Sequence, residues 1–205
     1  KRVVRLMQQV RLSAHCRIHR VVTTKANPKA KVAENVLDRQ FEADHPNQKW
    51  VADVTYVATA SGWLYLAVVL DLFSRRIVGW AMAATFDSEL VEQALSMALT
   101  QRKPGAGLLH HSDRGCQYTS EAYQSFLKQH GIQVSMSRKG NCWDNAVMER
   151  FFGTLKRECT SREHFKTHEE ARTAIFEYIE AFYNRVRKHS TLGYLSPVHF
   201  ELVNS

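Results

Sequence analysis

The sequence predicts an α/β protein with a mixed five-stranded sheet, in the order β-β-β-α-β-α-β-α, and with helices on both faces of the sheet. Two observations support this prediction. Three strand-like segments follow one another from residue 50, and from residue 87 helical patterns alternate with short apolar segments. Strands joined by tight turns pair antiparallel, whereas strands joined through a helix pair parallel, so the sheet is expected to contain both kinds of pairing.

The first three strands are expected at residues 50–58, 63–73 and 77–84. The first strand is rich in β-branched and aromatic residues. Gly62 supplies a turn before the second strand, whose run LYLAVVL is apolar enough for the centre of a sheet. The segment SRR then turns the chain into the third strand.

Helical spacing of apolar residues predicts a helix that Asp87 or Ser88 caps and that Pro104 ends. Asp144 is expected to cap a later helix. The remaining expected elements are strands at 108–113 and 132–137, helices within 119–131, 145–159 and 168–188, and a tail at 191–205.

The composition fits one globular core with appendages, because 44% of the 205 residues are hydrophobic and 23% are charged. No apolar run in the sequence reaches the length of a membrane span. The formal charge of +8 and the isoelectric point of about 9.5 favour a polyanionic partner, most often a nucleic acid. The four cysteines include no CxxC pair, and so few cysteines indicate a reducing compartment, the cytoplasm.

Three regions are expected along the chain: a basic arm and linker at 1–44, a folded core at 45–165, and a C-terminal helix and tail at 166–205. Residues 1–33 contain nine lysines and arginines and no acid. A solvated tail and an arm that contacts DNA both explain this charge block, and the sequence leaves the two interpretations open. Because the chain begins at Lys1 without a signal-like segment, we expect it to be a piece of a longer or processed protein.

Asp53 lies at the centre of the first expected strand, in KWVADVTYVA. Side chains alternate along a strand, so Asp53 shares a face with Val51, Thr55 and Val57. An unpaired buried carboxylate is costly, and aspartate is depleted from strands. Asp53 is therefore expected either at an open edge of the sheet or beside a cation; a partly exposed, hydrogen-bonded Asp remains the alternative.

Two further acids are expected near Asp53. Asp113 follows the fourth strand, which can neighbour the first, and ligands of open α/β sheets gather at such strand ends. Glu149 lies early in the helix after the fifth strand, on one stripe with Asn145, Gly153 and Lys156. Three carboxylates repel one another unless cations are present, and two Mg²⁺ ions would relieve that repulsion and clamp a phosphodiester.

Five segments together resemble the catalytic half of a bacterial insertion-sequence transposase, the product of a second reading frame with a retroviral-integrase-like core. They are NQKWVADVTYV, DLFSRRIVGWAM, HHSDRGCQYTS, GNCWDNAVMERFFGTLKREC and HSTLGYLSP. The resemblance covers residues 45–200 and implies a ribonuclease-H-like fold. It also implies a D,D(35)E triad, carried by Asp53, Asp113 and Glu149, with Mg²⁺ or Mn²⁺ as cofactor.

The resemblance further implies cutting and joining of DNA at transposon ends, at the bacterial nucleoid. The cation seven residues after the glutamate corresponds to Lys156, and the asparagine one turn before it to Asn145. Cys116 stands where family members often have serine. Residues 1–44 resemble only the last basic helix and linker of the amino-terminal helix-turn-helix region expected of this family.

Other side chains are candidates for DNA contact. Lys139 and Arg138 precede the helix that carries Glu149, and Lys156 lies on that helix, so these cations are expected near phosphates. Trp143 either stacks on an unpaired base or holds the loop to the core. His111 is expected to form a structural hydrogen bond, and Asp71 to cap a turn with Ser74.

Three functions remain open from the sequence: a transposase that cuts and joins DNA, a structure-selective nuclease of the same fold, and a DNA-binding module without chemistry. The first requires two DNA ends to be held at once, so a homodimer or a higher oligomer is expected on DNA. No membrane partner is expected.

Overall fold

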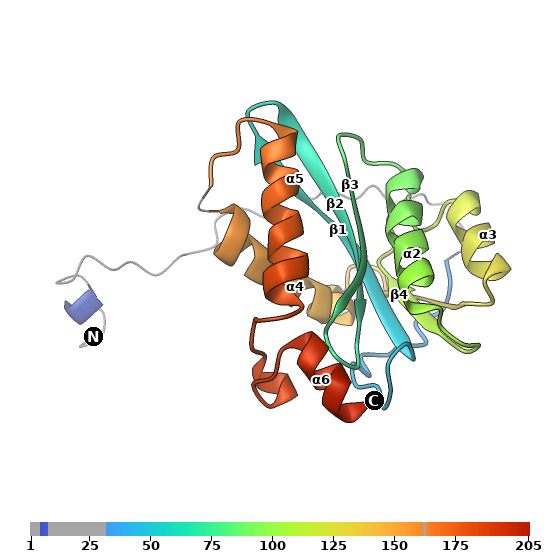
Figure 1. Cartoon of the computed structure of the whole chain (residues 1–205). Helices are drawn as coiled ribbons and strands as arrows, with labels where there is room; N and C mark the ends of the chain where they lie inside the picture. The colour runs from blue at the N-terminus through green and yellow to red at the C-terminus, as the bar shows by residue number, and fades with distance from the viewer. Residues whose placement is uncertain (1–4, 8–31, 162) are drawn as a thin grey trace.

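The centre of the protein is a mixed five-stranded sheet with the strand order β3-β2-β1-β4-β5 (Figure 1). The computed structural model describes residues 5–7, 32–161 and 163–205. Most of the basic arm expected at 1–33 lies outside the described residues. The strands are β1 (Lys49–Thr59), β2 (Gly62–Asp71), β3 (Ile77–Ala83), β4 (Leu109–Ser112) and β5 (Gln133–Met136).

Strand pairing follows the expected pattern. β1 and β2 form an antiparallel hairpin whose turn contains Gly62, with a φ of +116° that favours glycine. β2 pairs antiparallel with β3, whereas β4 pairs parallel with both β1 and β5. The predicted neighbourhood of the first and fourth strands is therefore confirmed, and this pairing positions the site described below.

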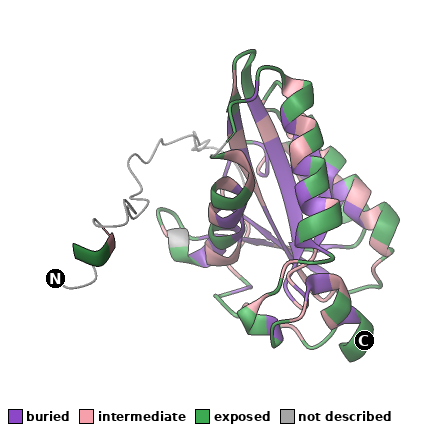
Figure 2. Cartoon of the chain, turned by 60° about the vertical axis from the view of Figure 1, so that its left-hand side comes forward, coloured by how far each residue is buried: buried purple, intermediate pink, exposed green. Residues whose placement is uncertain are grey.

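Helices cover both faces of the sheet (Figure 1). α2 (Ser88–Arg102) and α3 (Glu121–Gln129) pack against the face that carries Trp50 and Ala52. α4 (Ala146–Leu155) and α5 (His168–Phe176) pack against the face that carries Val51 and Val57. The buried strands lie between these helix layers (Figure 2), as the alternation of side chains along β1 predicts.

Helix ends agree with the sequence in part. Asp87, one of the two residues expected at this position, caps α2 by accepting a hydrogen bond from the backbone N–H of Leu90. α4 continues into a π-helical turn at Lys156–Thr160, and α5 into another at Glu177–Tyr183. The helix expected at 168–188 therefore ends about a turn earlier than predicted.

The expectation of a tail at 191–205 is wrong, because α6 (Pro197–Asn204) forms there. Ser196 caps this helix by accepting a hydrogen bond from the N–H of His199, and Pro197 occupies its first turn. A single turn of 3₁₀ helix, Ser190–Leu192, precedes it. Within the described residues, no helix is both long enough and apolar enough to cross a membrane.

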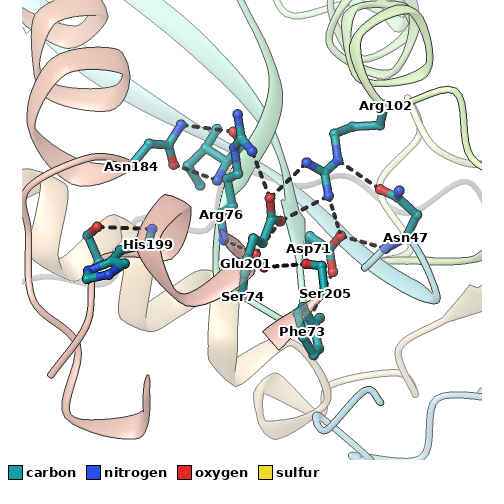
Figure 3. A network of polar contacts seen from close by, with 12 residues as sticks. Asn47, Asp71, Phe73, Ser74, Arg76, Arg102, Asn184, His199, Glu201 and Ser205 are labelled. Atoms are coloured by element: carbon teal, nitrogen blue, oxygen red, sulfur yellow. Dashed lines mark hydrogen bonds and ion pairs between the residues drawn. The ribbon is translucent and has the colours of Figure 1, made fainter. Parts of the chain in front are cut away.

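A buried ionic network fixes α6 to the sheet (Figure 3). The Glu201 carboxylate accepts hydrogen bonds from Ser74 Oγ at 2.7 Å and from Arg76 Nη1 at 2.7 Å. It also accepts two hydrogen bonds from Arg102 at 2.9 Å. Asp71 lies beside Arg102 and accepts hydrogen bonds from the backbone N–H of Phe73, so its predicted role as a turn cap is confirmed.

Residues 34–37, expected within a linker, lie against β5. The carbonyl of Glu34 accepts a hydrogen bond from the N–H of Met136, and the N–H of Leu37 donates to Ser135 Oγ. The Leu37 side chain is buried in the same core as α4 and α5. This segment therefore covers an edge strand that would otherwise expose unpaired backbone groups.

Candidate active site

Asp53 and Asp113 lie on neighbouring parallel strands at the point where their pairing ends. The β1–β4 register pairs Val51 with His111, and Asp113 directly follows β4. Two residues further along the same register, Asp53 is alongside Asp113. Alternation also gives Asp53 the face of Val51, which α4 and α5 cover.

Both aspartates are half-buried, and each is held by a short local hydrogen bond. Asp53 Oδ1 accepts a hydrogen bond from the backbone N–H of Val54 at 2.8 Å. Asp113 Oδ1 accepts one from the N–H of Gly115, also at 2.8 Å. One oxygen of each carboxylate is thereby oriented, while no hydrogen bond engages the other oxygen within the described part of the chain.

Glu149 lies on α4, which packs on the sheet beside the two aspartates. Met148, Phe151 and Leu155 are buried and fix α4 on the sheet, while Glu149 is exposed on another side of the helix. At the start of the helix, Asn145 Nδ2 donates a hydrogen bond of 3.4 Å to the carbonyl of Ala52, the residue before Asp53. Asn145 therefore ties the first turn of α4 to β1 beside the acids.

The electrostatics indicate that Asp53 lies within reach of the charges of the other two acids. Burial raises the pKa of the Asp53 carboxyl well above its usual range, and the charges of Asp113 and then Glu149 raise it further. Burial also raises the pKa of Asp113. Lys156 opposes the effect on Asp53, and its ammonium lies 5.0 Å from the centre of the Tyr56 ring.

The donor set consists of carboxylate oxygens, the ligands that Mg²⁺ and Mn²⁺ prefer. Among the described residues, no three His, Cys, Asp or Glu side chains are close enough as they stand to hold a metal ion. Asp113 affects Asp53 more strongly than Glu149 does. Glu149 is exposed on α4, so its side chain has room to change conformation beside the aspartates.

The predicted DNA-contact residues differ in their surroundings. Trp143 is 70% exposed, so it is not the staple between loop and core that was one of its two interpretations. Lys139 is exposed. Arg138 forms ion pairs with Asp144 and Asp38, at 2.9 and 3.0 Å, so its guanidinium is already engaged.

Asp144 has a different role from the predicted helix cap. Its buried carboxylate accepts hydrogen bonds from Asn35, from Arg39 and from both the backbone and the side chain of Arg138, each between 2.9 and 3.0 Å. The hydrogen bonds from Arg138 hold the pKa of Asp144 well below its usual range. Asp144 thus joins the segment before the sheet to the loop before α4. The N-cap of α4 is Asn145, which forms no side-chain capping hydrogen bond, while Asn141 caps the preceding 3₁₀ turn by accepting a hydrogen bond from the N–H of Trp143.

His111 has the structural role that was expected. Its ring nitrogens lie 2.8 Å from Ser135 Oγ and 3.1 Å from Ser137 Oγ. Burial lowers the pKa of His111 to about 4, so the ring is neutral at pH 7. This histidine orders β4 against β5 and holds no charge near the carboxylates.

Glu149 also lines a groove with a volume of about 1080 Å³. One side is α4, including Glu149 and Lys156, and the other is the segment from Tyr183 to Tyr194. The sequence showed that RVRKHSTLGYLSP is basic, but periodicity gave no sign that this segment lies beside α4. Arg75, in the β2–β3 turn, also lines the groove and was not among the predicted site residues.

Comparison with protein families gives two adjoining matches. Residues 43–142 match a family described as integrase core domain, and residues 130–197 match a second family with the same description. Together these matches include all three acids and the segment that forms the far side of the groove.

Two curated relatives are similar over most of the chain. The "Insertion element IS600 uncharacterized 31 kDa protein" of Shigella sonnei is 49% identical over 97% of this chain and 73% of its own length. "Transposase InsF for insertion sequence IS3A" of Escherichia coli (strain K12) is 51% identical over 84% of this chain. The match spans 60% of the InsF protein, so this chain corresponds to part of such a protein.

Solved structures share the fold at low sequence identity. A chain of the simian T-cell lymphotropic virus intasome aligns over 87% of this chain and 61% of its own, with a TM-score of 0.66 and 17% identity. The HTLV-2 integrase catalytic core domain in complex with magnesium aligns over 77% of this chain and 97% of its own, with a TM-score of 0.59 and 17% identity. The predicted ribonuclease-H-like fold is therefore confirmed.

Proposed function

Because the chain belongs to the insertion-sequence transposases that have an integrase-like catalytic core, we propose that it cuts and joins DNA at the ends of an insertion sequence. Asp53, Asp113 and Glu149 are the proposed catalytic residues. The observation that carries the proposal is the meeting of two half-buried aspartates at the β1–β4 junction, within electrostatic reach of a glutamate on α4.

The three acids are also the proposed metal ligands, for two Mg²⁺ or Mn²⁺ ions. Their oxygens are hard donors. Burial raises the pKa of Asp53, and the negative charges of Asp113 and Glu149 raise it further, which a bound cation would offset. The HTLV-2 integrase core was solved in complex with magnesium. When bound, the ions would supply activation of the attacking oxygen and stabilisation of the leaving oxygen.

The chain itself contributes position and charge. The rigid strands β1 and β4 hold Asp53 and Asp113, and Asn145 fixes the turn of α4 that carries Glu149. Lys156 lies near Asp53 and would meet the phosphate backbone there. Lys139 is the second proposed phosphate contact, and the exposed Trp143 would stack on a base unpaired near the cut.

Cutting replaces a phosphorus–oxygen bond of the backbone with a bond to the oxygen of water, which releases a 3′-hydroxyl. Joining replaces another phosphorus–oxygen bond with a bond to that 3′-oxygen. Joining needs DNA ends to be held together, so a homodimer or a higher oligomer on DNA is part of the proposal. The site of action would be the bacterial nucleoid.

The test uses labelled DNA that carries insertion-sequence ends, incubated with Mg²⁺ and with the wild type, Asp113→Asn or Asp44→Asn. Asparagine can keep the hydrogen bond from Gly115, so the loop should remain folded. We expect Asp113→Asn to reduce cutting and joining by about 100-fold or more, with unchanged DNA binding. Asp44 is exposed and lies outside the site, so Asp44→Asn should act like the wild type.

The products separate the possible functions. Joined strands support the transposase, whereas cut strands alone would indicate a nuclease of the same fold. Binding without any cutting, at several Mg²⁺ and Mn²⁺ concentrations, would indicate a DNA-binding module. Cutting by Asp113→Asn at the wild-type rate would refute the catalytic assignment.

A further inference from the structure

The groove beside α4 has a strong excess of positive charge. Glu149 is the one acid among the described residues that line it. The cationic lining residues are Arg75, Arg150, Lys156, Arg157, Arg187 and Lys188. This imbalance goes beyond the net charge of the chain, because it is concentrated on one concave surface.

Some of these cations are balanced by the protein. Arg187 forms two hydrogen bonds of 2.8 and 2.9 Å with Glu158, and Arg157 lies 3.7 Å from the same carboxylate. Within the described residues, Arg150 and Lys188 form no ion pair and no side-chain hydrogen bond. Both residues line the groove, and no described residue pairs with their charges.

Arg75 differs from the other cations of the groove in its backbone conformation and in a guanidinium nitrogen that the described residues leave unpartnered. Its φ of 61° is in the left-handed region, so the turn holds it in a conformation that a non-glycine residue rarely adopts. Nη2 donates a hydrogen bond to the carbonyl of Phe41 at 2.9 Å, but the buried Nη1 has no partner among the described residues. Buried donors without a partner are rare and point to a missing acceptor.

The surroundings of Arg75 indicate the charge of that acceptor. Burial lowers the pKa of Arg75, and the nearby guanidinium of Arg150 lowers it further. His189, which also lines the groove, has a buried Nε2 without a hydrogen-bond partner within the described part of the chain. Two guanidinium groups and an unsatisfied imidazole nitrogen would all be stabilised by one anion.

We propose that Arg75, Arg150 and His189 form a subsite for one phosphate of a DNA strand, which the groove guides past Glu149. The inference rests on the proposed function and names a substrate contact outside the carboxylates. A guanidinium matches the geometry of a phosphate with two parallel hydrogen bonds. A neutral imidazole can donate one further hydrogen bond to the same group.

The shape of the groove favours a strand over a free anion. A volume of about 1080 Å³ is far larger than one phosphate group needs. Lys188, Ser190 and Thr191 continue the lining with a cation and two hydroxyl groups, which suit successive backbone phosphates. Tyr194, also part of the lining, is 68% exposed and available to stack on a base.

The experiment measures DNA affinity against salt concentration, in EDTA and in an Asp113→Asn background, so no chemistry contributes to the signal. Loss of one phosphate contact lowers the slope of log K against log salt by about 0.9 for a duplex. We expect this change for Arg150→Ala. Arg75→Lys keeps the charge but loses the planar fork, so it should weaken DNA binding while leaving the slope close to that of the wild type. The matched control is Arg185→Ala, an exposed arginine outside the groove lining.

Equal slopes for Arg150→Ala and Arg185→Ala, with both variants folded by circular dichroism, would overturn the proposal. If the residues bind an isolated anion instead, inorganic phosphate should stabilise the wild type against heat and Arg150→Ala should remove that stabilisation. The salt slope for DNA would then be unchanged by Arg150→Ala, and this result would also overturn the proposal. A wild type that binds DNA but does not cut would refute the proposed activity and leave the subsite intact.

Discussion

At the scale of single residues, the site combines two aspartates whose charged forms the fold disfavours. Burial raises the pKa of both Asp53 and Asp113, and their proximity adds to the effect on Asp53. A carboxyl with a raised folded-state pKa stabilises the fold fully below its unfolded-state pKa. That contribution is lost as the pH rises through the raised value. Without metal, the site therefore destabilises the protein at neutral pH.

We predict that Asp113→Asn stabilises the metal-free protein at pH 7, because burial raises the pKa of the Asp113 carboxyl and the asparagine carries no charge to bury. The gain should disappear below about pH 4, where both aspartates are protonated in the folded and unfolded states. Thermal unfolding in EDTA from pH 3 to pH 8 measures this difference. Adding Mg²⁺ should stabilise the wild type more than the variant.

Asp44→Asn is the control, since Asp44 is exposed and is not among the residues whose charges shift the pKa of Asp53. If Asp113→Asn were less stable than the wild type by the same amount at every pH, the carboxyl would be a structural hydrogen-bond acceptor only. The predicted repulsion between the aspartates would then be absent.

The sequence predicted single residues well where strand geometry decides their position. Alternation and the end of a strand were enough to predict that Asp53 and Asp113 lie side by side. Asp144 was predicted wrongly as a helix cap, because its partner Arg39 is 105 residues away in sequence. Arg75 was missed for the same reason, since its place in the groove depends on the fold of residues 183–194.

At the scale of elements, the five strands and their order were predictable, because period-two and continuous apolar patterns are local signals. α6 was not predictable in this way. It has only eight residues, and its fixed position depends on Glu201, whose partners Ser74, Arg76 and Arg102 are 99 to 127 residues away. The contacts that stabilise this helix are absent from any local window of the sequence.

The packing of β3 against α2 depends on Gly79. A Cβ at this position would be 2.2 Å from the carbonyl oxygen of Ala94 and 2.7 Å from Ala98 Cβ. We predict that Gly79→Ala destabilises the protein by about 3 kcal/mol or more, because backbone and helix would have to separate. Urea denaturation measures the change in the free energy of unfolding.

Gly105→Ala provides the comparison, since no atom lies within 4 Å of the Cβ it would add. Its effect should be within about 0.5 kcal/mol of the wild type. A similar small effect for Gly79→Ala would mean that α2 can shift away from β3 without loss of packing.

At the scale of the whole molecule, the C-terminal region shares a core with the sheet. Ala171, Ile175, Ile179 and Tyr183 are buried together with Val51, Leu64 and Phe151 from the strands and α4. The predicted division between 45–165 and 166–205 follows the sequence pattern, yet the apolar surface continues across that boundary. A region that completes the core of its neighbour is expected to unfold together with it.

We therefore predict a single cooperative unfolding transition. Ile179→Ala and Leu64→Ala should both lower the free energy of unfolding of the whole protein. Each substitution truncates a fully buried side chain to a methyl group, and each should lower the free energy of unfolding by about 2 to 5 kcal/mol. Val203→Ala, at a side chain that is 56% exposed, is the control and should change little. Calorimetry tests cooperativity through equal calorimetric and van't Hoff enthalpies. Ile179→Ala could instead produce an early transition that leaves the unfolding of the sheet unchanged. Residues 166–205 would then be a separate domain, because their unfolding would not remove apolar cover that the sheet needs.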